Sequence, residues 1–173
     1  GVIMNINNYI KDIVDFPKKG IVFKDISPLL AEPKAFAYVV DNIAKKYNTQ
    51  SVDKIVGLDA RGFIFGAAVA YKMGVPFIMV RKPGKLPDQC ISVDYQLEYG
   101  QNTFEMHENS ISKNERVLIV DDLLATGGSV KAVSQLIKEL GAKIVALECV
   151  IELGFLNARQ DLNIAINAQI TYD

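Results

Sequence analysis

Residues 116–129 read Arg-Val-Leu-Ile-Val-Asp-Asp-Leu-Leu-Ala-Thr-Gly-Gly-Ser, and the rest of the chain can be understood from this run. Four consecutive branched apolar residues, 117–120, predict a strand buried on both faces, as in a parallel sheet. We expect this strand to end at two adjacent carboxylates, Asp121 and Asp122. Apolar residues at helical spacing between Val130 and Leu140 predict a helix after the loop.

The loop between this strand and this helix is predicted to bind a phosphate group. Its small residues let backbone N–H groups approach a ligand, and the helix N-terminus adds about half a positive charge. Thr126 and Ser129 add hydroxyl donors. The carboxylates of Asp121 and Asp122 repel a phosphate and instead suit ribose hydroxyls or a metal ion, so the whole junction suits a ribose 5-phosphate. An ordinary strand–turn–helix with acidic loop residues is the alternative interpretation. The loop lacks the Lys of a P-loop nucleotide site and the glycine spacing of a dinucleotide site.

A second strand–loop–helix junction precedes this one. Residues 54–59 and 76–80 predict two buried strands, and the small residues from Gly62 onward predict a tightly packed helix between them. Such a βαβ unit places its strands in parallel. The loop Asp59-Ala60-Arg61-Gly62 therefore puts Arg61 beside a helix N-terminus, which suits an anion. A plain βα turn that carries an Arg is the alternative.

A basic turn follows the strand at 76–80. Arg81, Lys82 and Lys85 lie close together with Pro and Gly between them, so a regular helix is not expected. The turn is either a solvated surface turn or, beside two anion sites, a mobile clamp on a diphosphate. Loops that follow parallel strands meet at one edge of the sheet. The three loops together fit 5-phosphoribosyl 1-diphosphate.

The remaining segments frame this core. Isoleucines at 3, 6, 10 and 13 follow helical spacing and predict an amphipathic helix, ended by Pro17, and residues 16–28 predict an apolar loop that packs against the core. Another helix is expected to begin at Pro33. We expect antiparallel strands over 91–100 and 102–108 around a flexible bend, and further strands over 142–151 and 164–172, the last at an edge.

Composition limits the possible partners and location. The 173 residues suit one domain, and the net charge of −1 gives no basic surface for nucleic acid or for a membrane. No apolar run approaches the roughly 18 residues that cross a bilayer. Cys90 and Cys149 are far apart and no signal-peptide pattern is present, so we expect a cytoplasmic location. His107 is the only histidine, which excludes a His-based triad or a His-rich metal site.

The run at 116–129 resembles the phosphoribosyl-diphosphate-binding signature of type I phosphoribosyltransferases. Within it, the residues at 121–128 specifically resemble those of members that act on adenine. The resemblance covers nearly the whole chain, from Phe16 to residue 156. It implies a single α/β domain, 1–173, with a mostly parallel twisted sheet flanked by helices. An N-terminal helix and base-binding hood, 1–33, and a flexible β-hairpin loop are implied to complete the core, 34–173.

The resemblance assigns roles to individual residues. Phe23 is implied to stack on adenine, backbone groups near Val22 and Lys24 to read its edge, and Leu153 to cover its other face. The catalytic residues that it implies are Arg61, Glu98, Asp121 and Asp122, with Glu98 shuttling a proton on the adenine ring. The Asp59–Ala60 peptide is expected to be cis, as is common in the family. The full set of implied binding residues is Val22, Phe23, Lys24, Ala60, Arg61, Arg81, Lys82, Lys85, Tyr99, Asp121, Asp122, Leu123, Leu124, Ala125, Thr126, Gly127, Gly128, Ser129 and Leu153.

The implied reaction joins adenine to phosphoribosyl diphosphate and releases AMP and diphosphate, as in purine salvage. The resemblance implies Mg²⁺ held mainly by the substrate, with no direct protein ligand, and a cytoplasmic homodimer whose basic turn can serve the partner's site. Two alternatives stay open: a phosphoribosyltransferase for another base such as xanthine or orotate, and a regulator that senses phosphoribosyl diphosphate without catalysis. The regulator would need a DNA-binding extension and a basic face, and the sequence shows neither.

Overall fold

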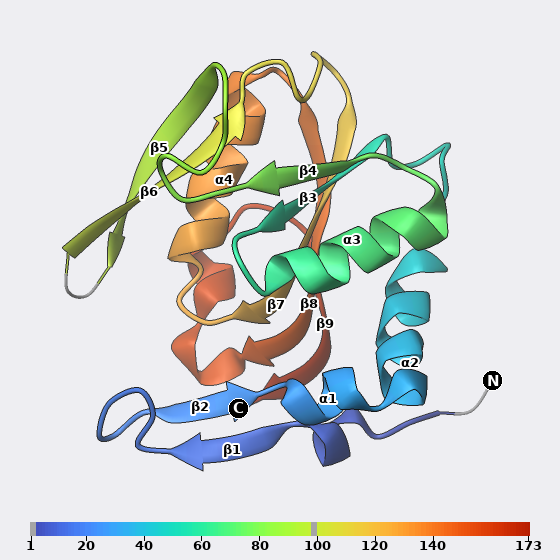
Figure 1. The fold of residues 1–173 in the computed structure, drawn as a ribbon, viewed down its shortest axis with the longest axis vertical. Helices are drawn as coiled ribbons and strands as arrows, with labels where there is room; N and C mark the ends of the chain where they lie inside the picture. The colour runs from blue at the N-terminus through green and yellow to red at the C-terminus, as the bar shows by residue number, and fades with distance from the viewer. Residues whose placement is uncertain (1–2, 98–99) are drawn as a thin grey trace.

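The computed structural model describes residues 3–97 and 100–173. Its centre is a five-stranded sheet in the order β4-β3-β7-β8-β9, and all neighbouring strands are parallel (Figure 1). The predicted parallel sheet, with its last strand at an edge, is confirmed. The strands are β3 (Lys54–Leu58), β4 (Phe77–Val80), β7 (Arg116–Leu124), β8 (Lys143–Leu153) and β9 (Ile166–Tyr172).

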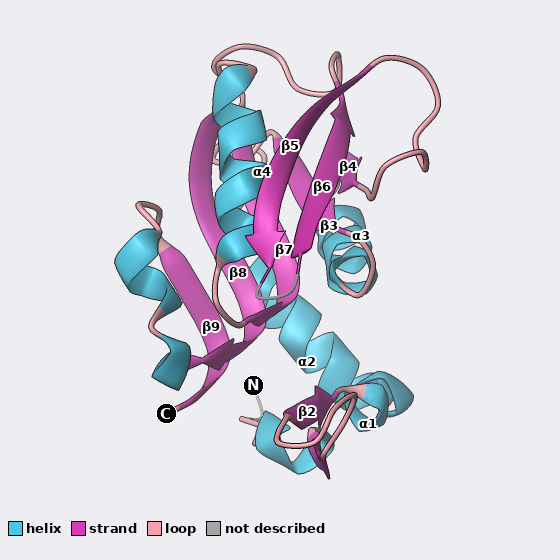
Figure 2. Cartoon of the chain, turned by 90° about the vertical axis from the view of Figure 1, so that its left-hand side faces the viewer, coloured by secondary structure: helices cyan, strands magenta, loops and turns pink. Residues whose placement is uncertain are grey.

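Helices cover both faces of this sheet. Helices α2 (Pro33–Ala44) and α3 (Gly62–Met73) pack with Leu118 and Val120 of β7 in one buried cluster. Helix α4 (Gly128–Glu139) packs with the alternate residue Ile119 in a second cluster on the opposite face, as Figure 2 shows. The strand β7 is thus buried on both faces, as its unbroken apolar run predicts. In the ranges that the structure describes, no helix is both long and apolar enough to cross a membrane.

Glycines allow α3 to lie close to the sheet. A Cβ at Gly57 of β3 would lie 2.7 Å from the Phe77 ring, and a Cβ at Gly66 of α3 would lie 2.6 Å from the same ring. Phe77 therefore occupies a space that exists only because both positions lack side chains. Gly74 and Gly141 follow the ends of α3 and α4 with φ of 71° and 76°, a left-handed conformation that glycine adopts readily.

Two hairpins flank the sheet. Strands β5 (Cys90–Leu97) and β6 (Gly100–His107) pair antiparallel, as predicted. The second hairpin joins β1 (Lys11–Val14) to β2 (Val22–Asp25) and leads into the short helix α1 (Ser27–Ala31).

The predicted helix at the start of the chain is wrong. The structure has a single 3₁₀ turn at Ile6–Tyr9, capped by the Asn5 side chain, and then β1. The prediction of a plain loop over 16–28 is wrong for the same reason, since β2 lies inside it. Backbone pairing between β1 and β2 decides both segments, and the apolar spacing along the chain carries no information about that pairing.

The strand β7 runs beyond its predicted end. It continues through Asp121 and Asp122 to Leu124, because β8 continues beside it and pairs with it as far as Glu152. The two carboxylates therefore stand on a strand held by a ladder of hydrogen bonds, and the loop before α4 is shorter than predicted.

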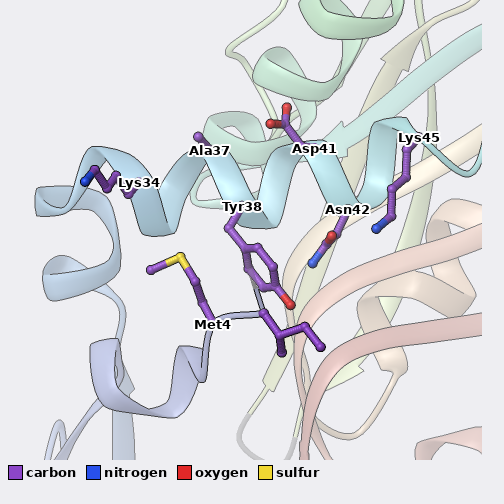
Figure 3. A pocket seen from close by; sticks show the side chains of 8 residues that line it. Met4, Lys34, Ala37, Tyr38, Asp41, Asn42 and Lys45 are labelled. Carbon is purple, nitrogen blue, oxygen red and sulfur yellow. The ribbon is translucent and has the colours of Figure 1, made fainter. Parts of the chain in front are cut away.

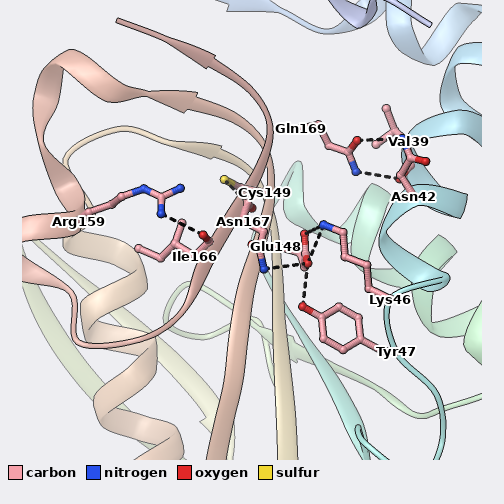
Figure 4. A network of polar contacts seen from close by, with 10 residues as sticks. All are labelled: Val39, Asn42, Lys46, Tyr47, Glu148, Cys149, Arg159, Ile166, Asn167 and Gln169. Carbon is pink, nitrogen blue, oxygen red and sulfur yellow. Dashed lines mark hydrogen bonds and ion pairs between the residues drawn. The ribbon is translucent and has the colours of Figure 1, made fainter. Parts of the chain in front are cut away.

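A buried carboxylate fastens the end of α2 to the sheet (Figure 4). Glu148 of β8 is fully buried and accepts hydrogen bonds from Lys46 at 3.2 Å, Tyr47 at 2.7 Å and Asn167 at 3.3 Å. Burial, together with the neighbouring Glu148 carboxylate, raises the pKa of Tyr47 well above its usual range. The network replaces the water that Glu148 loses on burial.

Candidate active site

A cavity of about 310 Å³ lies where β3 and β7 end. Its walls come from the β3–α3 loop, the basic turn, the β7–α4 junction and the β5–β6 hairpin. The lining residues are Leu58, Asp59, Ala60, Arg61, Lys82, Tyr95, Asn102, Phe104, Asp121, Asp122, Leu123 and Ser129. Parts of all three predicted loops therefore converge on one cavity.

Arg61 links the cavity to the N-terminal hairpin. Its Nε lies 2.7 Å from Oδ2 of Asp122, in an ion pair. Its guanidinium carbon also lies 5.0 Å from the centroid of the Phe23 ring, within cation–π distance. The Asp59–Ala60 peptide before it is cis, as expected.

Asp121 is turned toward the start of α3. Its Oδ1 would lie 2.7 Å from a Cβ at Gly62, so this approach requires glycine there. The same oxygen accepts a hydrogen bond of 2.9 Å from the backbone N–H of Asp122. Burial, and then the charge of Asp122, raise the pKa of the Asp121 carboxyl well above its usual range. The pair therefore holds a proton more readily than two exposed carboxyls would, and it can both donate to and accept from hydroxyl groups.

The predicted phosphate loop lies beside these carboxylates. Gly127 adopts φ of 89° directly before α4, and no side chain caps the first turn of the helix. The N–H groups of that turn are then available to an anion. Ser129 reaches the cavity, residues 125–128 form the adjoining bend and helix start, and Leu124 is buried in the core beneath.

The basic turn enters the site with only one of its three cations. Lys82 lines the cavity. Arg81 pairs through its backbone with Glu105 of β6, and its Nε lies 3.4 Å from Asp59 Oδ2. Lys85 is exposed and does not line the cavity.

One of the four predicted base-binding residues, Phe23, lines a separate, smaller cavity of about 240 Å³. Phe23 lines this cavity together with Ile13, Phe16 and Asp25. The Phe16 and Phe23 rings meet edge-on, with 5.1 Å between their centroids. Val22 is half exposed and lines neither cavity.

Lys24 and Leu153 also lie outside both cavities. The Lys24 ammonium contacts Asp12 at 2.7 Å and stands 3.8 Å from the centroid of the Tyr172 ring. Leu153 ends β8 and packs partly buried against the core. Arg61 therefore lies between Asp122 of the larger site cavity and Phe23 of the smaller one.

The β5–β6 hairpin contributes cavity residues that the sequence did not predict. Tyr95 and Asn102 are cross-strand partners, and the Tyr95 ring stacks on Phe104 at 4.7 Å. All three line the cavity. Strand alternation could have placed them on one face of the hairpin, but it could not have shown which face turns toward the sheet edge. The predicted Glu98 and Tyr99 lie outside the described residues.

Two further observations bear on ligands. A larger cavity, about 640 Å³, lies on α2 around Met4, Tyr38 and Asn42 (Figure 3), and none of the predicted site residues that the structure describes lines it. Among the described residues, no group of three or more His, Cys, Asp or Glu side chains is placed to hold a metal ion.

Known proteins resemble this chain closely. The model of the phosphoribosyl transferase domain family matches residues 25–162. The adenine phosphoribosyltransferases of Syntrophotalea carbinolica and Geobacter metallireducens are 55% and 53% identical to it, and each alignment covers 91% of this chain and 92% of the relative.

Solved structures agree with this likeness. The adenine phosphoribosyltransferase of Thermoanaerobacter pseudethanolicus superposes with a TM-score of 0.92 at 45% identity, covering 96% of this chain and 98% of the other. The enzyme of Saccharomyces cerevisiae, solved with an imino-altritol bisphosphate and adenine, gives a TM-score of 0.90 at 37% identity, covering 95% and 96%.

Proposed function

The chain belongs to the phosphoribosyltransferase family, and within it to the adenine phosphoribosyltransferases, and we propose how its residues carry out that reaction. The reaction transfers the 5-phosphoribosyl group of phosphoribosyl diphosphate to adenine, giving AMP and diphosphate in purine salvage. The observation that carries the proposal is the convergence of Arg61, Lys82, Asp121, Asp122 and Ser129 on one cavity.

The sugar phosphate binds at the β7–α4 junction. The 5-phosphate meets the uncapped first turn of α4, with Thr126 and Ser129 as hydroxyl donors. The ribose hydroxyls bind Asp121 and Asp122. Support comes from the open helix terminus and from the two adjacent carboxyl groups in the cavity, whose oxygens can accept hydrogen bonds from ribose hydroxyls.

Arg61 has to exchange partners when the substrate binds. Its guanidinium pairs with Asp122 and lies near Phe23, the two groups proposed to meet ribose and adenine. A diphosphate is a stronger partner for an Arg, because it offers more acceptors and more negative charge. Moving Arg61 toward the diphosphate releases both the carboxylate and the aromatic face.

The chemical step is displacement of diphosphate at the anomeric carbon by a nitrogen of adenine. The sugar gains positive charge in an oxocarbenium-like transition state, and Asp122 lies where a negative charge would stabilise it. Arg61 and Lys82 oppose the charge that grows on the diphosphate, with Arg81 and Lys85 as further candidates. Glu98 is proposed to move the proton on the base and Tyr99 to cover it.

We further propose that Mg²⁺ enters on the substrate. Phosphate oxygens of the substrate would hold the ion, and it would supply positive charge to the leaving diphosphate. We propose a homodimer in the cytoplasm. The two free cysteines, Cys90 and Cys149, are consistent with a reducing compartment, and analytical ultracentrifugation tests the dimer.

Two assays test these roles. Labelled phosphoribosyl diphosphate with Mg²⁺ and each base in turn should release diphosphate with adenine and not with xanthine or orotate; no release with any base would favour a sensing role. Asp122→Ala should lower kcat/KM by at least about tenfold, because its charge acts mainly in the transition state. An unchanged kcat/KM would contradict the assignment of Asp122.

A further inference from the structure

An ion pair lies behind the phosphate loop and outside the cavity. Arg159 donates from Nε to Glu152 Oε2 at 2.8 Å and from Nη2 to Glu152 Oε1 at 2.9 Å, which is a two-bond fork. Its third group, Nη1, donates to the backbone oxygen of Ile166 at 3.0 Å, as Figure 4 shows. The reaction proposed above uses neither residue.

The ion pair fastens both ends of one connection. Glu152 stands near the end of β8, and Ile166 is the first residue of β9. The chain between them forms two short 3₁₀ turns, Gly154–Leu156 and Ala158–Asp161. Arg159 lies in the second turn, so its guanidinium ties that turn to both strands.

The carboxylate of this pair is held firmly. Glu152 is 5% exposed and also accepts a hydrogen bond from Thr171 of β9 at 3.4 Å. The hydrogen bonds from Arg159 lower the pKa of Glu152. Bidentate geometry on a buried carboxylate fixes direction as well as distance, which a lone surface pair does not.

The fastened turn packs against the phosphate loop. A Cβ at Gly127 would lie 3.1 Å from Ala158 Cβ and 3.2 Å from Leu162 Cδ1. These two side chains flank Arg159 in sequence and Ala158 is buried. They fill the space on the side of Gly127 where a Cβ would lie, so the left-handed bend before α4 is packed against this turn.

We propose that Arg159 is a positioning residue for the 5-phosphate. Its fork on Glu152 fixes the turn that carries Ala158, and this turn holds the bend at Gly127 so that the first N–H groups of α4 point at the phosphate. The inference rests on the proposed function, since it assumes that residues 126–129 bind the phosphate.

The test measures two ligands that occupy opposite ends of the site. By isothermal titration, Arg159→Ala should weaken ribose 5-phosphate binding about tenfold, since misplacing a binding group by a fraction of an ångström has an effect of this order. Mg-diphosphate should bind within twofold of wild type, because its contacts lie at the other end. Arg159→Lys should fall in between, since lysine keeps the charge but not the fork.

Arg116 provides the matched control. It makes the same kind of fork with Asp53, at 3.0 and 2.9 Å, and also donates to the backbone oxygen of Gln50, far from the phosphate loop. Arg116→Ala should lower the unfolding temperature without changing either dissociation constant. If Arg159→Ala does not fold, Leu162→Ala removes the contact with Gly127 while leaving the ion pair, and it should weaken ribose 5-phosphate binding in the same way.

The outcomes separate this inference from the proposed function. Thr126→Val tests the loop itself. If Thr126→Val weakens ribose 5-phosphate binding and neither Arg159→Ala nor Leu162→Ala does, the positioning role is overturned and the loop assignment stands. If none of the three changes binding, both are overturned. Equal weakening by Arg116→Ala would also overturn the positioning role, because it would show a general effect of lost stability.

Discussion

Replacing Gly62 by alanine should damage catalysis through Asp121. The added Cβ would lie 2.7 Å from Asp121 Oδ1 and 3.4 Å from the backbone oxygen of Val120, where ordinary contacts begin at 3.4 Å. Because α3 is packed on the sheet, the carboxyl group has to give way. Overpacking of this kind costs about 1–3 kcal/mol, and for a chain of this size the melting temperature should fall by roughly 2–12 °C.

The effect on turnover should be larger than the effect on stability suggests. A displaced Asp121 no longer meets the ribose hydroxyl in the geometry of the transition state, so kcat/KM should fall about ten- to hundredfold in a steady-state assay of AMP formation. Gly66→Ala, on the same helix as Gly62, is the control, because its Cβ would lie 2.6 Å from the Phe77 ring of β4. It should destabilise the protein similarly and keep kcat/KM. Unchanged catalysis by Gly62→Ala, or equal losses in both variants, would refute the role given to Asp121.

Three further results are expected. Asp121→Asn should become more stable relative to the wild type as pH rises from 3.8 toward neutral, as measured by urea titrations. The raised folded-state pKa of Asp121 means that the wild-type protein loses stability as pH rises from the unfolded-state pKa through the folded-state pKa, and asparagine does not ionise. A wild-type advantage that widens with pH would contradict this. Phe23→Ala should raise the KM for adenine about 2- to 12-fold, the range expected for lost ring stacking, and change the KM for phosphoribosyl diphosphate little; an unaltered adenine KM would rule out stacking. EDTA should stop turnover yet leave the melting temperature of the substrate-free protein unchanged, because the described residues include no cluster of three or more candidate metal ligands. A lower melting temperature would point to a resident ion.

The central sheet was predictable because its signals are local. Apolar runs over 54–58 and 117–120, each followed by a loop rich in small residues, are sufficient to indicate buried parallel strands joined by helices. The N-terminal segment shows the opposite case. Its isoleucines follow helical spacing, but Lys11–Val14 pairs with Val22–Asp25, and the pairing overrides the spacing.

The residues of the active site also fall into a group that local sequence signals predict and a group that only tertiary packing places. Asp121 lies toward the carboxyl end of β7, Arg61 directly precedes α3 and Ser129 lies in the first turn of α4, so their positions relative to the sheet edge follow from topology. Tyr95, Asn102 and Phe104 lie within strands of a hairpin, and only the packing of that hairpin brings them to the cavity. The contact between Arg61 and Phe23 joins parts of the chain whose relative placement the local pattern does not encode. The roles of Glu98 and Tyr99 stay predictions.

The order of the strands places the proposed sugar-phosphate site apart from the proposed base-binding hairpin. From the central pair β3 and β7, the chain proceeds outward to β4 on one side and to β8 and β9 on the other. The cavity at the carboxyl ends of β3 and β7 results from the order in which the strands are connected. It would therefore remain if the N-terminal hairpin carried different side chains. Evolution, or a protein engineer, could therefore graft a different hairpin onto the same sheet and change which nucleobase is accepted, while the hold on the phosphorylated pentose is inherited unaltered.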